Sequence, residues 1–113
     1  MAKMDIDLLA LIIVSRSQSK KLMANLNKKQ FYFTLIDSSS SLFHEATDLL
    51  LLGFHHTRMD TLNKLVQKYC QPFRKFVPVQ IHASGEISHL PVLESIEGGA
   101  ILYGMPVEYF EQI

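Results

Sequence analysis

The sequence predicts an α+β protein with the ferredoxin-like βαββαβ order, and three observations support that prediction. Four segments rich in aliphatic or aromatic residues have the length of strands, at residues 8–14, 31–36, 49–54 and 100–105. The first and third of these are each followed by a segment with apolar residues at helical spacing. The chain has 113 residues, which is the size of one domain. We therefore expect a single sandwich domain over residues 1–113.

The first half of the chain contains two strands and a helix in this interpretation. Residues 8–14 form a continuous apolar run, which is typical of a strand covered on both faces. Either Ser17 or Ser19 is expected to cap a helix that continues to about Lys29. The aromatic and β-branched residues at 31–36 then predict the second strand.

The second half again has a strand followed by a helix, and then a short segment with a weaker strand signal. Residues 49–54 predict the third strand, and a helix is expected from about Thr57 until Pro72 ends it. Residues 76–81 predict a short extended segment, which Pro78 limits to the edge of a sheet because proline cannot donate a ladder hydrogen bond.

Two loops and a broken final strand complete the pattern. A large loop is expected over residues 37–48, where four consecutive serines interrupt the apolar pattern, and a smaller loop over residues 82–91. The last extended region covers residues 92–96 and 100–105, with a turn or bulge at the glycines between them.

The strand pattern also predicts an oligomer. Two helices can cover only one face of a four-stranded sheet, yet residues 8–14 and 49–54 are apolar on both faces. Because a large exposed apolar face is unfavourable in water, we expect other copies of the chain to bury the second face.

Composition excludes several classes of protein. The formal net charge is zero, made up of +1 over residues 1–57, +4 over residues 58–75 and −5 over residues 76–113. A chain-wide basic excess is missing, so we expect no DNA or RNA partner. No apolar run reaches the roughly 20 residues of a membrane-spanning helix. We therefore expect a cytoplasmic protein without membrane insertion.

The residues with chemical potential do not form a recognisable catalytic or metal-binding pattern. His55 and His56 are adjacent at a strand end, so their side chains are expected on opposite faces, where they cannot easily share one ion. Solvated histidines are therefore favoured over a metal site assembled across subunits. Cys70 lies near a helix C-terminus, which disfavours a thiolate. We expect no catalytic residue, no metal site and no cofactor, and hence no enzyme.

A specific pattern covers nearly the whole chain. Its ending combines Gly98-Gly99-Ala100 with the sequence MPVEYF at 105–110 and Gln112. Further positions run in register from the first strand to the second helix: Leu22, Phe31, Thr34, Gly53, Arg58, Asp60, Leu62, Leu65 and Cys70. In these features the chain resembles the P-II-like cyclic di-AMP receptor proteins of Gram-positive bacteria.

The resemblance implies a P-II-like homotrimer that binds a cyclic dinucleotide in the clefts between subunits, near the base of the large loop. Thr34, Gly53 and Gln112 match positions that contact the ligand in that family. Leu42 and Phe43 stand where the family has Phe-Leu, so an aromatic ring for base stacking is expected in a shifted position. These five residues are the expected ligand-binding residues.

Other positions depart from the family pattern. Tyr32 stands where the family has an arginine, and Gln30 where it usually has an asparagine. Residues 38–41 are serines where the family has Thr-Thr-Gly-Gly, and Ala46-Thr47 replaces Gly-Asn. An arginine supplies a planar charged donor that tyrosine lacks, and glycines permit a close backbone approach to a ligand.

Two functional hypotheses follow. In the first, the chain is a non-enzymatic regulator in signal transduction that responds to a small ligand, with cyclic di-AMP as the ligand that the resemblance implies. In the second, it is a degenerate P-II-like trimer that has lost cyclic di-AMP binding and acts as a protein-interaction module with an unknown protein partner.

Overall fold

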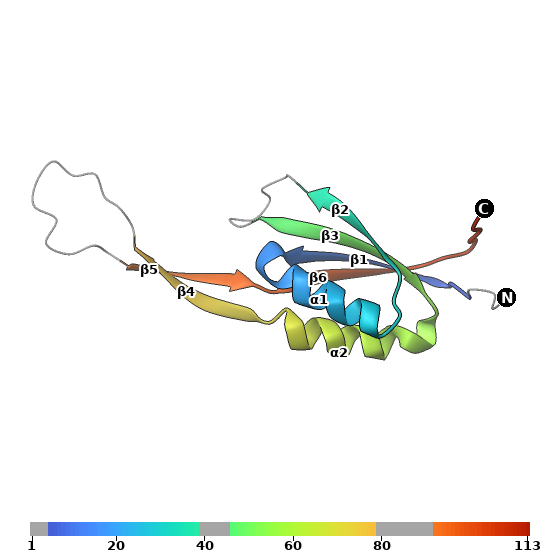
Figure 1. Cartoon of the computed structure of the whole chain (residues 1–113), viewed down its shortest axis with the longest axis horizontal. Coiled ribbons are helices and arrows are strands. Elements are labelled where there is room, and N and C mark those ends of the chain that lie inside the picture. The colour runs from blue at the N-terminus through green and yellow to red at the C-terminus, as the bar shows by residue number, and fades with distance from the viewer. Residues whose placement is uncertain (1–4, 39–45, 79–91) are drawn as a thin grey trace, which may run out of the picture.

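The computed structural model describes residues 5–38, 46–78 and 92–113 (Figure 1). The expected small loop at 82–91 lies outside these residues, as does the central part of the expected large loop. The elements in chain order are β1 (Leu8–Ser15), α1 (Arg16–Lys28), β2 (Phe33–Ser38), β3 (Thr47–Phe54), the 3-10 turn η1 (His56–Arg58), α2 (Met59–Tyr69), β4 (Pro72–Pro78), β5 (Val92–Gly98) and β6 (Ala100–Pro106).

The main sheet has the strand order β2-β3-β1-β6, and each neighbouring pair is antiparallel. Both helices lie against the same face of this sheet (Figure 1). This arrangement confirms the ferredoxin-like α+β fold expected from the order of apolar segments. The long apolar strands β1 and β3 pair along eight residues at the centre, where burial is greatest.

The segment after α2 differs from the expectation. Its strand β4 is the segment 72–78 rather than 76–81, and it pairs with β5 in a separate two-stranded ribbon that extends away from the main sheet (Figure 1). The expected break before the last strand is confirmed, since Gly98 and Gly99 both have positive φ, at 79° and 85°. The chain turns there from the ribbon into the main sheet.

A glutamine on α1 joins the ribbon to the main body. The side-chain amide of Gln18 donates to the carbonyl of Gln71 at 2.8 Å. Its carbonyl oxygen accepts from the backbone N–H of Gly99 at 3.0 Å. One side chain thus contacts the chain at the base of the ribbon on both strands, just before β4 starts and just after β5 ends.

The start of α1 also differs from the expectation that Ser17 or Ser19 caps it. The helix begins at Arg16 with Ser15 at the N-cap position, and no side chain makes a cap hydrogen bond there. Ser19 is fully buried, and its hydroxyl donates to the carboxylate of Asp48 at 2.6 Å. Burial against β3 therefore takes this serine away from the helix terminus.

The core lies between the sheet and the helices. Alternate residues of β1 and β3 point toward α1 and α2, which contribute aliphatic side chains from one side of each helix. The buried apolar residues are Ala10, Ile12, Val14, Leu22, Leu26, Phe31, Leu50, Leu52, Phe54, Leu62, Leu65 and Cys70. Burial raises the pKa of the Cys70 thiol to about 11, in line with the expectation of an unreactive cysteine.

The opposite face of the main sheet carries apolar side chains without a covering layer among the described residues. Leu11 lies at its centre, paired with Leu51 on one side and Tyr103 on the other. The outer positions are partly open, with Tyr103 52% and Met105 42% exposed. We call this surface, formed by Leu9, Leu11, Ile13, Thr34, Ile36, Leu49, Leu51, Gly53, Ile101, Tyr103 and Met105, the open face.

The described helices are short. In the described residues, no helix has the length and apolar character to cross a membrane.

Candidate functional site

A pocket of about 740 Å³ lies at one end of the open face. It forms where β1 and β2 begin and β3 ends, and the C-terminal tail after β6 closes one side. The lining residues come from all four of these segments: Ile6, Leu9, Tyr32, Phe33, Thr34, Leu51, Gly53, Val107, Phe110, Glu111 and Gln112.

Strand register brings two of the expected ligand-binding residues together. Thr34 on β2 lies opposite Leu51 on β3, so their side chains share the open face. Gly53 follows two residues later on the same face, opposite Leu9 of β1. The floor of the pocket is therefore set by the pairing of three neighbouring strands.

Gly53 leaves room that any other residue would fill. A Cβ at this position would lie 3.0 Å from Cγ2 of Ile6, which is tighter than nearly all real contacts. Both residues line the pocket. A side chain at position 53 would therefore displace Ile6 and reduce the space for a ligand.

The C-terminal tail supplies the third expected residue. The N–H of Val107 donates to the carbonyl of Asp7 at 2.9 Å, which holds the start of the tail beside the segment before β1. The following residues Phe110, Glu111 and Gln112 reach the pocket. The tail thus adds an aromatic ring, a carboxylate and an amide to the hydroxyl of Thr34.

The carboxylate has a neighbour within the tail. The hydroxyl of Tyr109 donates to Glu111, and this hydrogen bond raises the pKa of the Tyr109 phenol. Among the described lining residues, Glu111 is the one with a formal charge. The described wall of the pocket is therefore apolar with a few polar groups, as small-molecule sites usually are.

The expected ligand-binding residues separate into two groups. Thr34, Gly53 and Gln112 line this one pocket although they are far apart in the sequence. Leu42 and Phe43 lie outside the described residues. The expectation that the five act together in ligand binding stays a prediction.

Some lining residues were missed by the sequence reasoning. Tyr32, which is 71% exposed, was noted only as a departure from the family, and Phe110 only as part of the ending. Residues at i and i+2 on one strand share a face. Tyr32 stands two residues before Thr34, so this spacing could have indicated that Tyr32 lines the pocket. The path of the tail depends on long-range contacts and has no such local signal.

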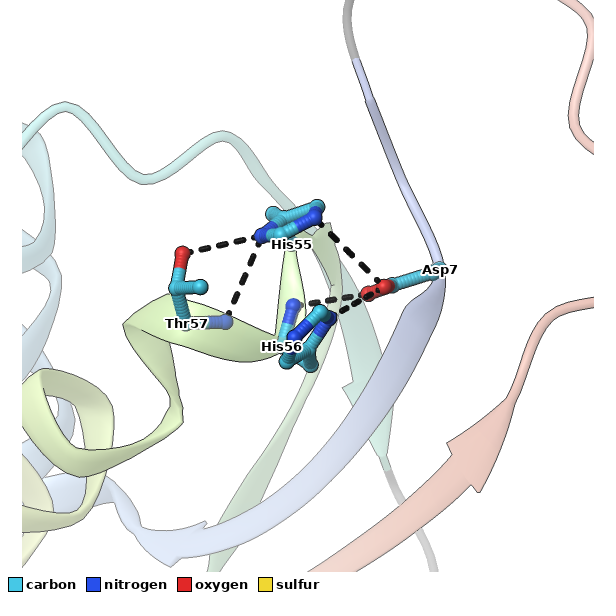
Figure 2. Close-up of polar contacts among 4 residues, drawn as sticks. All are labelled: Asp7, His55, His56 and Thr57. Atoms are coloured by element: carbon cyan, nitrogen blue, oxygen red, sulfur yellow. Dashed lines mark hydrogen bonds and ion pairs between the residues drawn. The ribbon is translucent and has the colours of Figure 1, made fainter.

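A second cluster lies just beyond the end of β3, and it overturns the expectation for the two adjacent histidines. The rings of His55 and His56 do not lie on opposite faces, because their centroids are 4.2 Å apart with an interplanar angle of 38°. Both contact the carboxylate of Asp7 (Figure 2). Strand β3 has already ended at Phe54, so the alternation of side chains expected within a strand does not apply.

Hydrogen bonds from His56 hold the carboxylate of Asp7 in this cluster. Oδ1 of Asp7 accepts from the backbone N–H of His56 at 2.7 Å, and Oδ2 lies 2.5 Å from the Nδ1 of the same residue. The hydrogen bond with the His56 side chain is the largest of the effects that hold the pKa of Asp7 below its ordinary value. Asp7, His55 and His56 together bring three potential metal-ligating atoms within 4.8 Å of one another.

Comparisons with known proteins identify the family. Residues 7–113 match the family model described as cyclic-di-AMP receptor. No curated protein matches the chain. A crystal structure of a functionally unknown protein from Pediococcus pentosaceus ATCC 25745 is similar in fold, with a TM-score of 0.72 and 16% sequence identity over 96% of this chain and 98% of that chain.

Proposed function

The chain belongs to the cyclic-di-AMP receptor family, which is P-II-like, and from that premise we propose that it is a signalling protein without catalytic activity that binds cyclic di-AMP in the pocket beside the C-terminal tail. The observation that carries the proposal is the meeting of Thr34, Gly53 and Gln112 in one pocket. These are the residues that match the ligand-contacting positions of the family.

The groups in the pocket suit the base and sugar parts of a dinucleotide. The Thr34 hydroxyl and the Gln112 amide can each donate and accept hydrogen bonds. The Glu111 carboxylate can accept from the exocyclic amine of adenine, and the rings of Tyr32 and Phe110 can stack on bases. The proposed ligand pose directs the bases toward this wall and the phosphates away from Glu111.

We also propose that the functional unit is a cytoplasmic homotrimer. The open face is the surface that the copies would bury, since its aliphatic and aromatic side chains are covered by no described element. The pocket lies at the end of that face, where Thr34, Leu51 and Gly53 belong to both surfaces. In a trimer built in this way the pocket becomes a cleft between neighbouring subunits, to which the partner adds its own side chains.

Isothermal titration calorimetry with cyclic di-AMP and with ATP tests the proposal. We expect micromolar binding of cyclic di-AMP, weakened about tenfold by Thr34→Val or Gln112→Ala, because one polar contact to a buried ligand contributes roughly 1–3 kcal/mol. The matched controls Thr61→Val and Gln67→Ala change exposed residues of α2 and should leave the affinity unchanged. Absence of heat with both nucleotides, at protein concentrations that detect micromolar binding, contradicts the proposal.

One observation favours the second candidate function, a trimer that has lost the dinucleotide and binds a protein. Tyr32 lines the pocket at the position where the family has an arginine, so the charge that would pair with a phosphate is replaced by a neutral phenol. A pull-down from lysate with the wild-type chain and with a variant lacking residues 38–43 distinguishes the candidates. A partner that binds without nucleotide and is lost on deletion supports the second function, whereas unchanged partners rule out this role for the segment.

A further inference from the structure

We propose that Asp7, His55 and His56 form a binding site for a divalent transition-metal ion of the zinc type. The three side chains come from two segments that are 48 residues apart, the stretch before β1 and the junction between β3 and α2 (Figure 2). Their candidate ligand atoms lie within 4.8 Å of one another. Two imidazole nitrogens and a carboxylate oxygen form one of the ligand sets that proteins use for zinc.

The backbone holds the two histidines in place. His55 is the N-cap residue of η1, with φ −82° and ψ 142°, and His56 is the first residue of that turn. The change from extended to 3-10 backbone between them turns both imidazoles toward Asp7 (Figure 2). A continued strand would have separated them, so the turn is what creates the cluster.

The carboxylate is also oriented before any ion binds. The N–H of His56 donates to Oδ1 of Asp7 at 2.7 Å, which directs Oδ2 toward the two imidazoles. Oδ2 lies 2.5 Å from Nδ1 of His56 and 3.7 Å from Nε2 of His55. Around a tetrahedral ion with bonds of about 2.0–2.1 Å, neighbouring ligand atoms lie about 3.3 Å apart. The two separations measured from Oδ2 therefore lie within about 1 Å of the spacing that a tetrahedral ion requires.

Thr57 contacts the ring of His55 from outside the cluster. Nδ1 of His55 lies 2.9 Å from the Thr57 hydroxyl oxygen and accepts from the backbone N–H of Thr57 at 3.4 Å. Ligation of an ion through Nε2 requires the tautomer in which Nδ1 carries the proton and donates it to that hydroxyl oxygen instead. Such an outer hydrogen bond accompanies most metal-ligating histidines.

Solvent can reach the cluster, so an ion has a route to it. The side chains of Asp7, His55 and His56 are 41%, 34% and 62% exposed. Two nitrogen ligands disfavour magnesium and calcium, which take oxygen ligands. Three protein ligands leave a fourth position for water or for a donor from a partner molecule.

The alternative is a cluster without a metal ion, in which Asp7 only accepts hydrogen bonds from the histidines. The metal-bound and the metal-free cluster use the same residues, so metal binding has to be measured directly. The site is separate from the dinucleotide pocket, since Asp7, His55 and His56 are not among its lining residues. Metal binding and nucleotide binding can therefore fail independently.

Calorimetric titration of the full-length, tag-free, chelator-treated chain with Zn²⁺ tests the proposal. We expect one ion per chain, with affinity reduced at least tenfold in each of Asp7→Asn, His55→Gln and His56→Gln. The matched control replaces the three remaining histidines together, as His44→Gln, His82→Gln and His89→Gln, and should bind as the wild type does. Absence of binding, wild-type affinity in the three cluster variants, or loss of binding in the control overturns the proposal.

Nitrogen NMR of the imidazoles in the wild-type chain keeps the test independent of how the variants fold. On addition of Zn²⁺, the ring nitrogens of His55 and His56 should shift while those of the other three histidines stay in place. Shifts confined to the other histidines contradict the site. The Thr57→Val variant keeps all three ligands and should weaken binding about tenfold, because only the outer hydrogen bond is removed. Wild-type affinity in Thr57→Val contradicts the proposed role of Thr57.

Discussion

The hydroxyl of Ser19 donates a 2.6 Å hydrogen bond to Oδ2 of Asp48, which joins the first turns of α1 to the beginning of β3. Both residues are buried, and the other carboxylate oxygen lies 3.2 Å from Nε of Arg16. The backbone N–H of Arg16 also donates to the carbonyl of Ala46 at 3.0 Å. These contacts fix the chain where it enters β3, on the sheet that carries the pocket.

Removal of the Ser19 hydroxyl should destabilise the fold. The Ser19→Ala variant leaves a buried carboxylate oxygen without this donor, so we expect the free energy of unfolding to fall by about 1–3 kcal/mol. Urea denaturation measures it. The control Lys20→Ala alters an exposed position of the same helix and should change stability by less than about 0.5 kcal/mol. Equal stability of the two variants would contradict the assigned role of the buried hydrogen bond.

A methyl group at position 53 should obstruct the pocket. In Gly53→Ala the added Cβ meets Ile6 at 3.0 Å, and we expect the affinity for cyclic di-AMP to fall about tenfold or more. The matched control is Gly104→Ala, because a Cβ there meets no atom within 4 Å. Calorimetry on both variants checks this, and equal affinities would show that the space beside Ile6 is not used by the ligand.

The buried thiol should make stability depend on alkaline pH. The pKa of Cys70 is raised from 9.0 to about 11 in the folded chain, so the folded state keeps a proton that the unfolded state loses between these values. The free energy of unfolding should therefore fall by about 2–3 kcal/mol as the pH rises from 9 through 11. Denaturation across this range, compared with Cys70→Ala, isolates the effect. A wild-type slope no steeper than that of the variant would contradict it.

A charge at the centre of the open face should prevent association. Leu11→Asp places a carboxylate between Leu51 and Tyr103, and burial of an unpaired charge is strongly unfavourable. Size-exclusion light scattering should give three times the 12.9 kDa chain mass for the wild type and the single mass for the variant. The control Thr61→Asp lies on the exposed side of α2 and should remain trimeric. A monomeric wild type would contradict the proposed trimer.

The sequence predicted the fold well because its strongest signals are local. The apolar runs of β1 and β3 and the helical spacing in α1 and α2 depend on neighbours within a few residues. The ribbon was harder to predict from the sequence, since the pairing of β4 with β5 joins residues 14 to 26 positions apart. Pro72 and Pro78 also weakened the strand signal.

In the candidate sites too, the residues with a sequence signal could be predicted, whereas long-range contacts could not. Thr34, Gly53 and Gln112 could be named from the family pattern, whereas the meeting of tail and sheet required the structure. The His55–His56 prediction failed because it applied the alternation of strand side chains to the two residues after Phe54, where a 3-10 turn begins. Asp7 carried no signal at all, because its partners are 48 and 49 residues away and only the start of β1 brings them together.

A crystal structure of the chain grown with cyclic di-AMP tests whether the dinucleotide binds in the proposed pocket. We expect a trimer with dinucleotide density in the cleft lined by Thr34, Gly53 and Gln112, and with a base near the ring of Tyr32 or Phe110. Clefts without dinucleotide density at saturating ligand, or density away from these residues, would contradict it.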